Sequence, residues 1–516
     1  MSLLNITNNN LLDLEYSIFY QSYIIKTTSN INNLIHRNNS NVPFDVSGTV
    51  SDIARQQAQR GEAGYKHSNG GSPGARVPLP EPLTQSTNPA SRQHTNLIIS
   101  DIKLLLNTEK DKIDNYQLNL TQKTLIESYN SSNLYEILKI KNLNYNFKKN
   151  ILKQLFYTKL TDTIYVMNFK ANIKSVFNIK NLTNAGLKLT EILFNENIIT
   201  SVKEGGAQNN QFHHFANAEL PGSFIVAVNY FINTKIPHLK YVWTANSLLP
   251  GNMGPNSPGL GDYFGYYKNH KNNWLMSNDM NGDITNIKNL DFIKNHFNIN
   301  GKVDLYTSDA GINLDVGEYN RQESIELQLK ISEIVCALIS LKSGGNMVIK
   351  AYTFFEKTMI DVIIILSKLF EVLKIIKPMT SKPANSEIYI VGKNFLSYEL
   401  AHPFIDLFIS YIKDFDTNIN FDINPTHSNF NGFLLDISDT DLLLFNNISK
   451  NIYYKQINWI KRNIYYFNLF YNDDSFINYK LFNNIFIKNI SKLVDFYYNK
   501  FIDSYELRFI SNNSNL

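Results

Sequence analysis

Between residues 181 and 397, short apolar runs alternate with longer helical patterns. The runs have the length and the β-branched or aromatic content of strands, and they lie at 212–218, 240–245, 303–309, 347–350 and 388–391. A helical pattern follows the third run, with apolar residues three or four positions apart at Leu327, Ile331, Ile334, Val335 and Leu338. This alternation predicts an α/β fold built on a mostly parallel, doubly wound sheet.

Two local patterns in this region need a decision. The segment 224–231, FIVAVNYF, has the propensity of a strand, but it follows a Pro-Gly turn where the alternation requires a helix. We predict a helix there. The glycines Gly344 and Gly345 predict the end of the helix that contains Leu338, because glycine is the usual residue just beyond a helix C-terminus.

The regions outside 181–397 have other patterns. Residues 1–44 carry apolar groups at mixed spacing, and we expect an N-terminal helical segment. Residues 98–180 predict a helical subdomain, and residues 398–516 predict a C-terminal helical extension. Residues 45–97 contain Pro, Gly and Arg but no Ile or Phe from 54 to 96, so they offer too little apolar surface to offset their ordering entropy. We predict a flexible linker or insertion.

Composition narrows the class of protein. The 516 residues are 43% apolar and 13% aromatic, which is ample for burial, and the net charge of +4 permits a nucleic-acid partner without requiring one. The one cysteine, Cys336, excludes an intramolecular disulfide framework and fits a reducing compartment. The start does not have the order of a signal peptide, and the apolar run 359–366 is far shorter than the roughly 20 residues of a membrane span. We expect a soluble intracellular protein.

Three charged residues mark the ends of predicted strands. Asp309 closes one run, Lys350 closes the next, and Glu387 comes directly before the run IYIV. Because the ends of parallel strands gather along one edge of the sheet, where a ligand crevice forms, these residues predict a site.

Two glycine-containing loops could border the same edge. The segment 215–224 reads FANAELPGSF, and a glycine turn after a first strand lets the backbone approach a nucleotide-like ligand closely. The segment 281–284 reads NGDI, and its carboxylate could accept from an amine or a ribose hydroxyl. Taken alone, each loop is equally well explained as an ordinary turn that binds no ligand. The glycine-rich 251–261 lacks the Gly-Lys-Ser/Thr of a phosphate loop, so we interpret it as an insertion, a lid or an RNA-contacting loop.

A metal site is not expected. His213 and His214 are adjacent, so on a strand they face opposite sides and do not converge on one ion.

Together these segments resemble the FtsJ-like ribose 2'-O-methyltransferases, and most closely the mRNA cap-specific branch. The resemblance covers about 181–395 and is strongest in KPMTSKPANSEIYIVGK at 377–393. The segments DMNGDIT at 279–285, DLYTSDAG at 304–311 and GGNMVIKAY at 344–352 are also similar to sequences of this family. The resemblance implies a Rossmann-like methyltransferase fold with helical N- and C-terminal additions.

The resemblance also implies a catalytic Lys-Asp-Lys-Glu tetrad. Its Asp falls on Asp309, its second Lys on Lys350 and its Glu on Glu387. The first Lys falls on Lys188 in AGLKLTEIL, with Lys203 as the second choice because its flanking residues match less well.

The chemistry of ribose methylation explains such a set. A ribose hydroxyl must lose its proton as it attacks the methyl group of a sulfonium, and a lysine with the ordinary pKa of about 10.4 is mostly protonated at neutral pH. Burial and a second ammonium both lower a lysine pKa, so Lys350 is the expected general base and Lys188 its cationic neighbour. Glu387 would hold the lysines in place, and Asp309 would orient the base and the methyl donor.

The implied methyl donor is S-adenosylmethionine. Pro221, Gly222, Ser223 and Phe224 would border its methionine part, Asp283 and Ile284 its adenosine part, and no metal is needed. The turn departs from the family pattern, with Ala216 at the acidic position and Ser223 in place of the second glycine. Glu219 is then the candidate to take over the ammonium of the donor.

The sequence therefore predicts methylation of the first transcribed nucleotide or nucleotides of a capped mRNA. Two alternatives stay open: 2'-O-methylation of another RNA, such as rRNA, and a non-catalytic RNA-binding or assembly module on a methyltransferase fold. We expect no membrane partner. We favour a cytoplasmic over a nuclear location, and the sequence would suit a protein encoded by a virus or a cytoplasmic genetic element. A capping or transcription partner protein and the oligomeric state are left open.

Overall fold

The computed structural model describes residues 20–31, 89–114, 116, 161, 169–199, 210–248, 261–275, 281–314, 317–417, 435–470 and 488–516. Outside these ranges lie residues 251–260 of the predicted insertion 251–261, the second-choice Lys203 and most of the predicted linker and helical subdomain, including 117–160. In the described ranges, no helix is long and apolar enough to cross a membrane.

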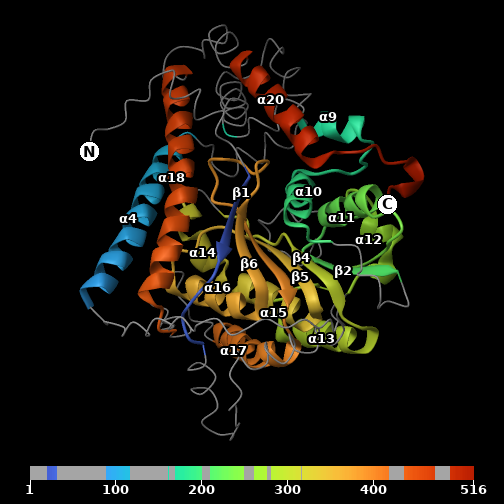
Figure 1. Ribbon diagram of the computed structural model, residues 1–516, viewed down its shortest axis with the longest axis horizontal. Coiled ribbons are helices and arrows are strands. Elements are labelled where there is room, and N and C mark those ends of the chain that lie inside the picture. Colours follow the sequence, from blue (N-terminus) through green and yellow to red (C-terminus); the bar gives the residue numbers. More distant parts are fainter. Residues whose placement is uncertain are drawn as a thin grey trace, which may run out of the picture.

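A single seven-stranded sheet organises the described part of the chain, in the order β1-β6-β7-β5-β4-β2-β3 (Figure 1). The strands are β1 (Gln21–Ile25), β2 (Gln211–Asn217), β3 (Lys240–Asn246), β4 (Val303–Ser308), β5 (Leu341–Ala351), β6 (Phe370–Lys377) and β7 (Ile388–Phe395). Strands β3, β2, β4 and β5 pair parallel with one another, whereas β7 pairs antiparallel with both β5 and β6, and β6 pairs antiparallel with β1. The sheet thus has a parallel core and an antiparallel edge.

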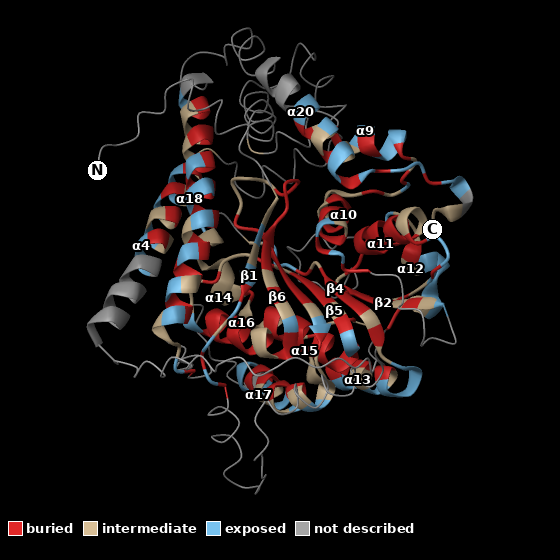
Figure 2. Ribbon diagram, viewed as in Figure 1, coloured by how far each residue is buried: buried red, intermediate tan, exposed pale blue. Residues whose placement is uncertain are grey.

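Helices cover both faces of the sheet (Figures 1 and 2). The described helices between residues 169 and 417 are α9 (Phe169–Val176), α10 (Asn184–Glu196), α11 (Ser223–Lys235), α12 (Tyr266–Asn269), α13 (Ile287–Asn300), α14 (Gln322–Ile325), α15 (Leu327–Ser340), α16 (Lys357–Leu369) and α17 (Tyr398–Thr417). Short 3-10 helices lie at η1 (Lys271–Asn273), η2 (Tyr319–Arg321) and η5 (Asn512–Ser514). The sequence prediction of an α/β fold with a doubly wound sheet is confirmed.

The two faces have separate apolar cores because side chains alternate along each strand. Tyr306 of β4 packs in the core that includes α13, α15 and α16, whereas the preceding Leu305 packs in the core formed with α10 and α11. Strand β5 alternates in the same way, with Met347 on the first side and Val348 on the second. Strands buried on both faces explain why the predicted runs are almost continuously apolar.

Three long helices lie beside this domain. Helices α4 (Pro89–Asp114) and α18 (Asp439–Phe470) run side by side, and α20 (Lys488–Tyr505) lies over α10 (Figure 1). The C-terminal part of the chain therefore packs against the same helices that cover the sheet.

Several predictions about elements were wrong. Gln21–Ile25 lies in the region expected to be helical but forms strand β1, because its Tyr and Ile residues complete the free edge of β6. Helix α4 begins at Pro89, inside the predicted linker 45–97. Helix α15 ends at Ser340, and Gly344 and Gly345 belong to β5, which starts without an intervening loop.

The other element predictions in the described ranges agree with the structure. The segment 224–231 is part of helix α11, as the alternation required. The predicted strands correspond to β2, β3, β4, β5 and β7, but β6 was not predicted. Glu371 and Lys374 interrupt its apolar run, and only pairing with β7 and β1 makes it a strand.

Candidate functional site

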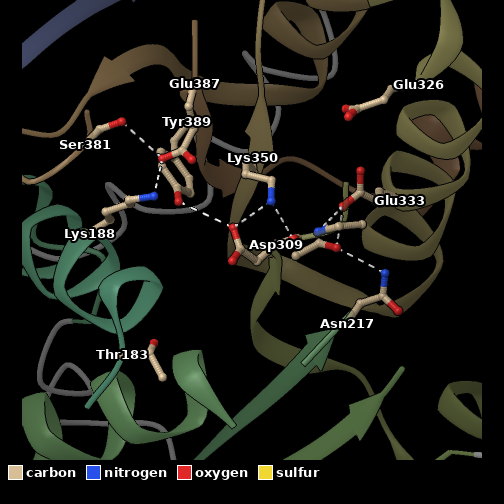
Figure 3. Close-up of polar contacts among 12 residues, drawn as sticks. Thr183, Lys188, Asn217, Asp309, Glu326, Glu333, Lys350, Ser381, Glu387 and Tyr389 are labelled. Atoms are coloured by element: carbon tan, nitrogen blue, oxygen red, sulfur yellow. Dashed lines mark hydrogen bonds and ion pairs between the residues drawn. The ribbon is translucent and has the colours of Figure 1, made fainter. Parts of the chain in front are cut away.

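The carboxyl ends of the parallel strands bring three of the predicted residues together. Asp309 directly follows β4, and Lys350 lies one residue before the end of β5. Glu387 directly precedes β7, which runs antiparallel to β5 with Ala351 opposite Ile388, so the start of β7 meets the end of β5. Lys188 reaches the same edge from the first half of α10 (Figure 3).

The four residues form two ion pairs. Lys188 Nζ is 2.6 Å from Glu387 Oε1, and Lys350 Nζ is 3.3 Å from Asp309 Oδ1. Lys350 Nζ also donates to the backbone carbonyl of Asp309 at 2.7 Å. The Asp309 side chain is the most exposed of the four, at 23%, while the Lys188 and Lys350 side chains are each 12% exposed. The two pairs are therefore partly enclosed, with Asp309 nearest to solvent.

Burial and charge act in opposite directions on the two inner groups. Burial alone would raise the pKa of Glu387, but the ammonium groups of Lys188, Lys350 and Lys377 lower it to about 2. Burial alone would lower the pKa of Lys350, but the nearby Asp309 carboxylate, with Glu387 and other groups, raises it above the ordinary value. At neutral pH, therefore, Glu387 is an anion and Lys350 is a cation in this structure.

This state differs from the expectation for Lys350. The sequence argument predicted a lowered pKa from burial and from the neighbouring Lys188. In the structure Asp309 lies 3.3 Å from Lys350 Nζ, whereas Lys188 is paired with Glu387. The effect of Asp309, Glu387 and other nearby groups on the pKa of Lys350 exceeds the lowering effect of burial.

The turn after β2 adopts a conformation that only glycine tolerates at one position. Gly222 has φ of 111°, and a Cβ there would overlap the ring of Tyr266. Glu219 Oε1 accepts the backbone N–H groups of Phe224 and Ile225 at 2.8 and 3.0 Å, which caps α11. Glu219 is 2% exposed, and burial raises its pKa to about 8. One oxygen of Glu219, the residue expected to meet the ammonium of a donor, thus holds the turn.

The other predicted residues of the turn lie around this cap. Pro221 follows Leu220 through a cis peptide bond, Ser223 is the first residue of α11, and Phe224 is fully buried in the core with α10. The sequence therefore fixes a closely packed turn at the end of β2.

The loop at 281–284 approaches the same strand ends from β3. Asp283 Oδ1 accepts the backbone N–H and the hydroxyl of Thr285 at 2.9 and 2.7 Å, while Ile284 is buried. Asn246, the last residue of β3, donates to the carbonyl of Gly282 at 2.9 Å. Gly282 has φ of 68° and has no room for a Cβ beside the Ser247 carbonyl. The loop is held against the strand end, with Asp283 half-buried beside it.

The structure adds residues that sequence reasoning missed. Tyr389 lies on β7 two positions after Glu387, and its hydroxyl donates to Asp309 Oδ1 at 3.4 Å (Figure 3). Ser381 donates to Glu387 Oε1 at 3.1 Å. The period of two in EIYIV could have indicated Tyr389, because alternate residues of a strand face one side. Ser381 had no signal other than its place in the 377–393 segment.

A second missed set lies beneath the strand ends. Asn246 Nδ2 donates to Asn217 Oδ1 at 2.9 Å, and Asn217 Nδ2 donates to Ser308 Oγ at 3.0 Å. Ser308 in turn donates to Glu333, which pairs with Lys330 at 2.6 Å. This buried chain of polar groups joins the ends of β3, β2 and β4, so it fixes the strand ends relative to one another.

The residues present fit S-adenosylmethionine, which carries a sulfonium, an ammonium and an adenosine. Asp309, the most exposed of the four charged residues, offers an anionic group at the strand ends, and Glu387 is an anion paired with Lys188 beside it, whereas the glycine turn at 221–224 is buried in this structure. A Cβ at Gly311 would lie 3.3 Å from Lys350 Nζ, so glycine keeps the space beside this ammonium open. Within the described ranges, no group of three or more His, Cys, Asp or Glu residues could hold a metal ion.

Comparisons with known proteins agree with the resemblance. The model of the family described as FtsJ-like methyltransferase matches residues 183–395. A probable methyltransferase of African swine fever virus is 37% identical over 236 residues, which are 44% of this chain and 52% of that protein. Cap-specific mRNA (nucleoside-2'-O-)-methyltransferase 2 of Drosophila melanogaster is 30% identical over 199 residues, or 38% of this chain and 28% of that protein.

Among solved structures, a ribosomal RNA methyltransferase from Plasmodium falciparum covers 42% of this chain and 98% of its own, with 18% identity and a TM-score of 0.28. The chain spans about half the length of the viral relative and less of the insect one.

Proposed function

We propose that this chain transfers a methyl group from S-adenosylmethionine to a ribose 2'-hydroxyl of RNA, because the FtsJ-like methyltransferase family model matches residues 183–395. The preferred substrate is the first transcribed nucleotide, or the first two, of a capped mRNA. The observation that carries the proposal is the meeting of two Lys-carboxylate pairs, Lys188–Glu387 and Lys350–Asp309, at the carboxyl ends of β4 and β5. Methyl transfer to a hydroxyl needs such a set to position the acceptor and receive its proton.

Lys350 is the proposed proton acceptor. Its raised pKa means that it must first lose a proton, so the attraction of Asp309 has to weaken or be offset by another positive charge. The donor supplies a methyl group on a cationic sulfur, and that charge favours the neutral lysine. Asp309 then positions Lys350 through its carbonyl, and Tyr389 restrains the Asp309 carboxylate.

Lys188 and Glu387 have the supporting role. The Glu387 anion holds the Lys188 ammonium at 2.6 Å, and the two side chains point toward one another (Figure 3). We assign the methionine part of the donor to the turn at Pro221, Gly222, Ser223 and Phe224, and its adenosine part to Asp283 and Ile284.

The preference for a capped end rests on two supports. The segment 377–393 resembles the cap-specific branch most strongly, and the relative from Drosophila melanogaster bears a cap-specific name. In the structure this segment supplies Ser381 and Glu387 to the site, so the sequence similarity includes residues that form or contact the tetrad. A partner protein of the capping or transcription apparatus is compatible with a chain that aligns with only part of each relative.

The test is methyl transfer from radiolabelled S-adenosylmethionine to three RNAs of one sequence: capped, uncapped with a 5'-triphosphate, and capped with the first ribose already methylated. We expect transfer to the capped RNA and identification of the product as a 2'-O-methyl nucleotide after nuclease digestion. Equal transfer to the uncapped RNA would remove the cap assignment, and binding of the donor without any transfer would indicate a non-catalytic module.

The role of Lys350 has its own test in the same assay. We expect Lys350→Met to lower kcat by about 10²-fold or more, because it removes the proton acceptor. Lys342→Met is the matched control, since Lys342 lies at the opposite end of the same strand and is half exposed beside Asp304. A normal kcat for Lys350→Met would show that another group accepts the proton.

A further inference from the structure

The C-terminal helix α20 contacts the methyltransferase domain at a buried carboxylate that none of the proposed catalytic roles uses. Glu191 lies on α10 one turn after Lys188 and has no solvent exposure. Its Oε1 accepts the hydroxyl of Tyr505, the last residue of α20, at 3.3 Å. Tyr505 is also buried, and its hydroxyl accepts from Asn195 Nδ2 at 2.8 Å, which fixes the direction of the bond to Glu191.

The other oxygen of Glu191 holds the segment that carries Glu387. Glu191 Oε2 accepts the backbone N–H of Thr380 at 3.0 Å and the Thr380 hydroxyl at 2.8 Å. The next residue, Ser381, donates to Glu387 Oε1 at 3.1 Å. Glu387 Oε1 is the same atom that pairs with Lys188. Two sets of hydrogen bonds, joined by the peptide bond between Thr380 and Ser381, therefore connect Tyr505 to the Lys188–Glu387 pair.

Burial of this carboxylate costs free energy that an apolar side chain of the same shape would not. Thr380 is fully buried, so its N–H group and hydroxyl need an acceptor, and Glu191 is the acceptor that meets both. The segment 378–387 has no helix or strand of its own, so side-chain contacts hold it: Glu191 binds its start, and Lys377 and Gln456 bind its later residues.

We infer that Glu191 and Tyr505 are positioning residues for methyl transfer, through which the C-terminal helix α20 sets the place of Glu387 and hence of Lys188. This inference rests on the proposed function. Neither residue touches the reacting groups; each acts through Thr380 and Ser381. The C-terminal extension is then part of the working site, although Tyr505 lies more than a hundred residues beyond the domain that matches the family.

The kinetic test uses the full chain and capped RNA. We expect Tyr505→Phe, which removes one hydroxyl, to lower kcat about 3- to 10-fold with little change in KM for RNA or donor. Glu191→Gln should lower kcat further, because its amide cannot accept at both positions. Thr380→Val should resemble Tyr505→Phe, and Thr380→Ser should retain activity because it keeps the hydroxyl.

Tyr230→Phe is the matched control. The Tyr230 hydroxyl also anchors the C-terminal segment, donating to the carbonyl of Arg508 at 2.8 Å and accepting its N–H at 3.1 Å, but it has no bond to the 378–387 segment. If both Tyr→Phe variants lowered kcat equally, Tyr505 would act only by holding the C-terminus in place, and the inference would be wrong.

Two further readouts separate positioning from general stability. The effects of Glu191→Gln and Ser381→Ala on kcat should be less than additive, since one acts through the other; full additivity contradicts the inference. Hydrogen exchange of the peptide containing the Thr380 amide should accelerate in Tyr505→Phe and not in Tyr230→Phe. Hydrogen exchange does not depend on catalysis, so an unchanged exchange rate in Tyr505→Phe overturns this inference whether or not the protein is active. Absence of methyl transfer by the wild-type protein is a different result, and it overturns the proposed function.

Discussion

Lys350 shows how neighbouring side chains outweigh burial at a single residue. Burial favours the neutral amine, but Asp309 beside it and Glu387 farther away favour the ammonium, and their sum raises the pKa of Lys350. Since only the neutral form can accept a proton, the reaction should accelerate as the pH rises toward the pKa of Lys350.

Asp309→Asn tests this dependence. Removing the carboxylate that lies 3.3 Å from Lys350 Nζ should lower the pKa of Lys350, so the rise in rate with pH should shift to lower pH. The maximal rate should fall, because a neutral amide in place of the carboxylate cannot hold Lys350 as firmly. The measurement is single-turnover methyl transfer at pH values from about 6 to 10. Asp304→Asn, at the other end of β4, is the control, and an unmoved profile in Asp309→Asn would mean that another group titrates.

At the scale of elements, the turn between β2 and α11 is specified by more than its sequence pattern. The pattern predicts that glycine allows close approach, and the structure shows why Gly222 itself is required. Its φ of 111° strains any other residue, and the ring of Tyr266 fills the space where a Cβ would lie.

Gly222→Ala should therefore lower the free energy of unfolding by about 1 to 3 kcal/mol and should weaken donor binding as well. Gly301→Ala is the matched control, because Gly301 also has a positive φ but no atom within 4 Å of the added Cβ. We expect it to lose about 1 kcal/mol without a change in donor affinity. Urea unfolding and donor titration measure both effects, and equal losses in the two variants would show that Tyr266 moves aside freely.

At the scale of the whole molecule, the two terminal regions are tied to each other and to the sheet. Strand β1 forms the edge beside β6, and the segment after it meets the first turn of α18. Asp441, fully buried in that turn, accepts the backbone N–H groups of Thr28 and Ser29 at 2.8 Å each. The described N-terminal segment and the C-terminal extension therefore share one anchoring point.

Asp441→Ala should lower the free energy of unfolding by about 2 to 4 kcal/mol, because it leaves these buried N–H groups without their acceptor. Asp406→Ala is the control, since Asp406 is 61% exposed in a surface pair with His402 and should matter by less than about 0.5 kcal/mol. Denaturant unfolding compares the variants. A loss at Asp441 no larger than that at Asp406 would show that the terminal regions are held by other contacts.

The sequence was sufficient for the features that repeat locally or occur as a continuous segment. Apolar alternation predicted the strands β2, β3, β4, β5 and β7 and the helix at 224–231, because burial on both faces leaves a pattern in neighbouring positions. Three charged residues at strand ends were correctly expected to meet, since parallel strands end at one edge. The resemblance then led to Lys188, which the structure places 2.6 Å from Glu387.

Only the tertiary structure decided the features that depend on partners far apart in the chain. Strand β1 exists because β6 offers a free edge, and the charge of Lys350 depends on which carboxylates face it. Glu219 binds the first N–H groups of α11, and Tyr505 reaches the site through Glu191. No local pattern carries such information, because hydrogen bonds and charges act between groups that only the folded chain brings together.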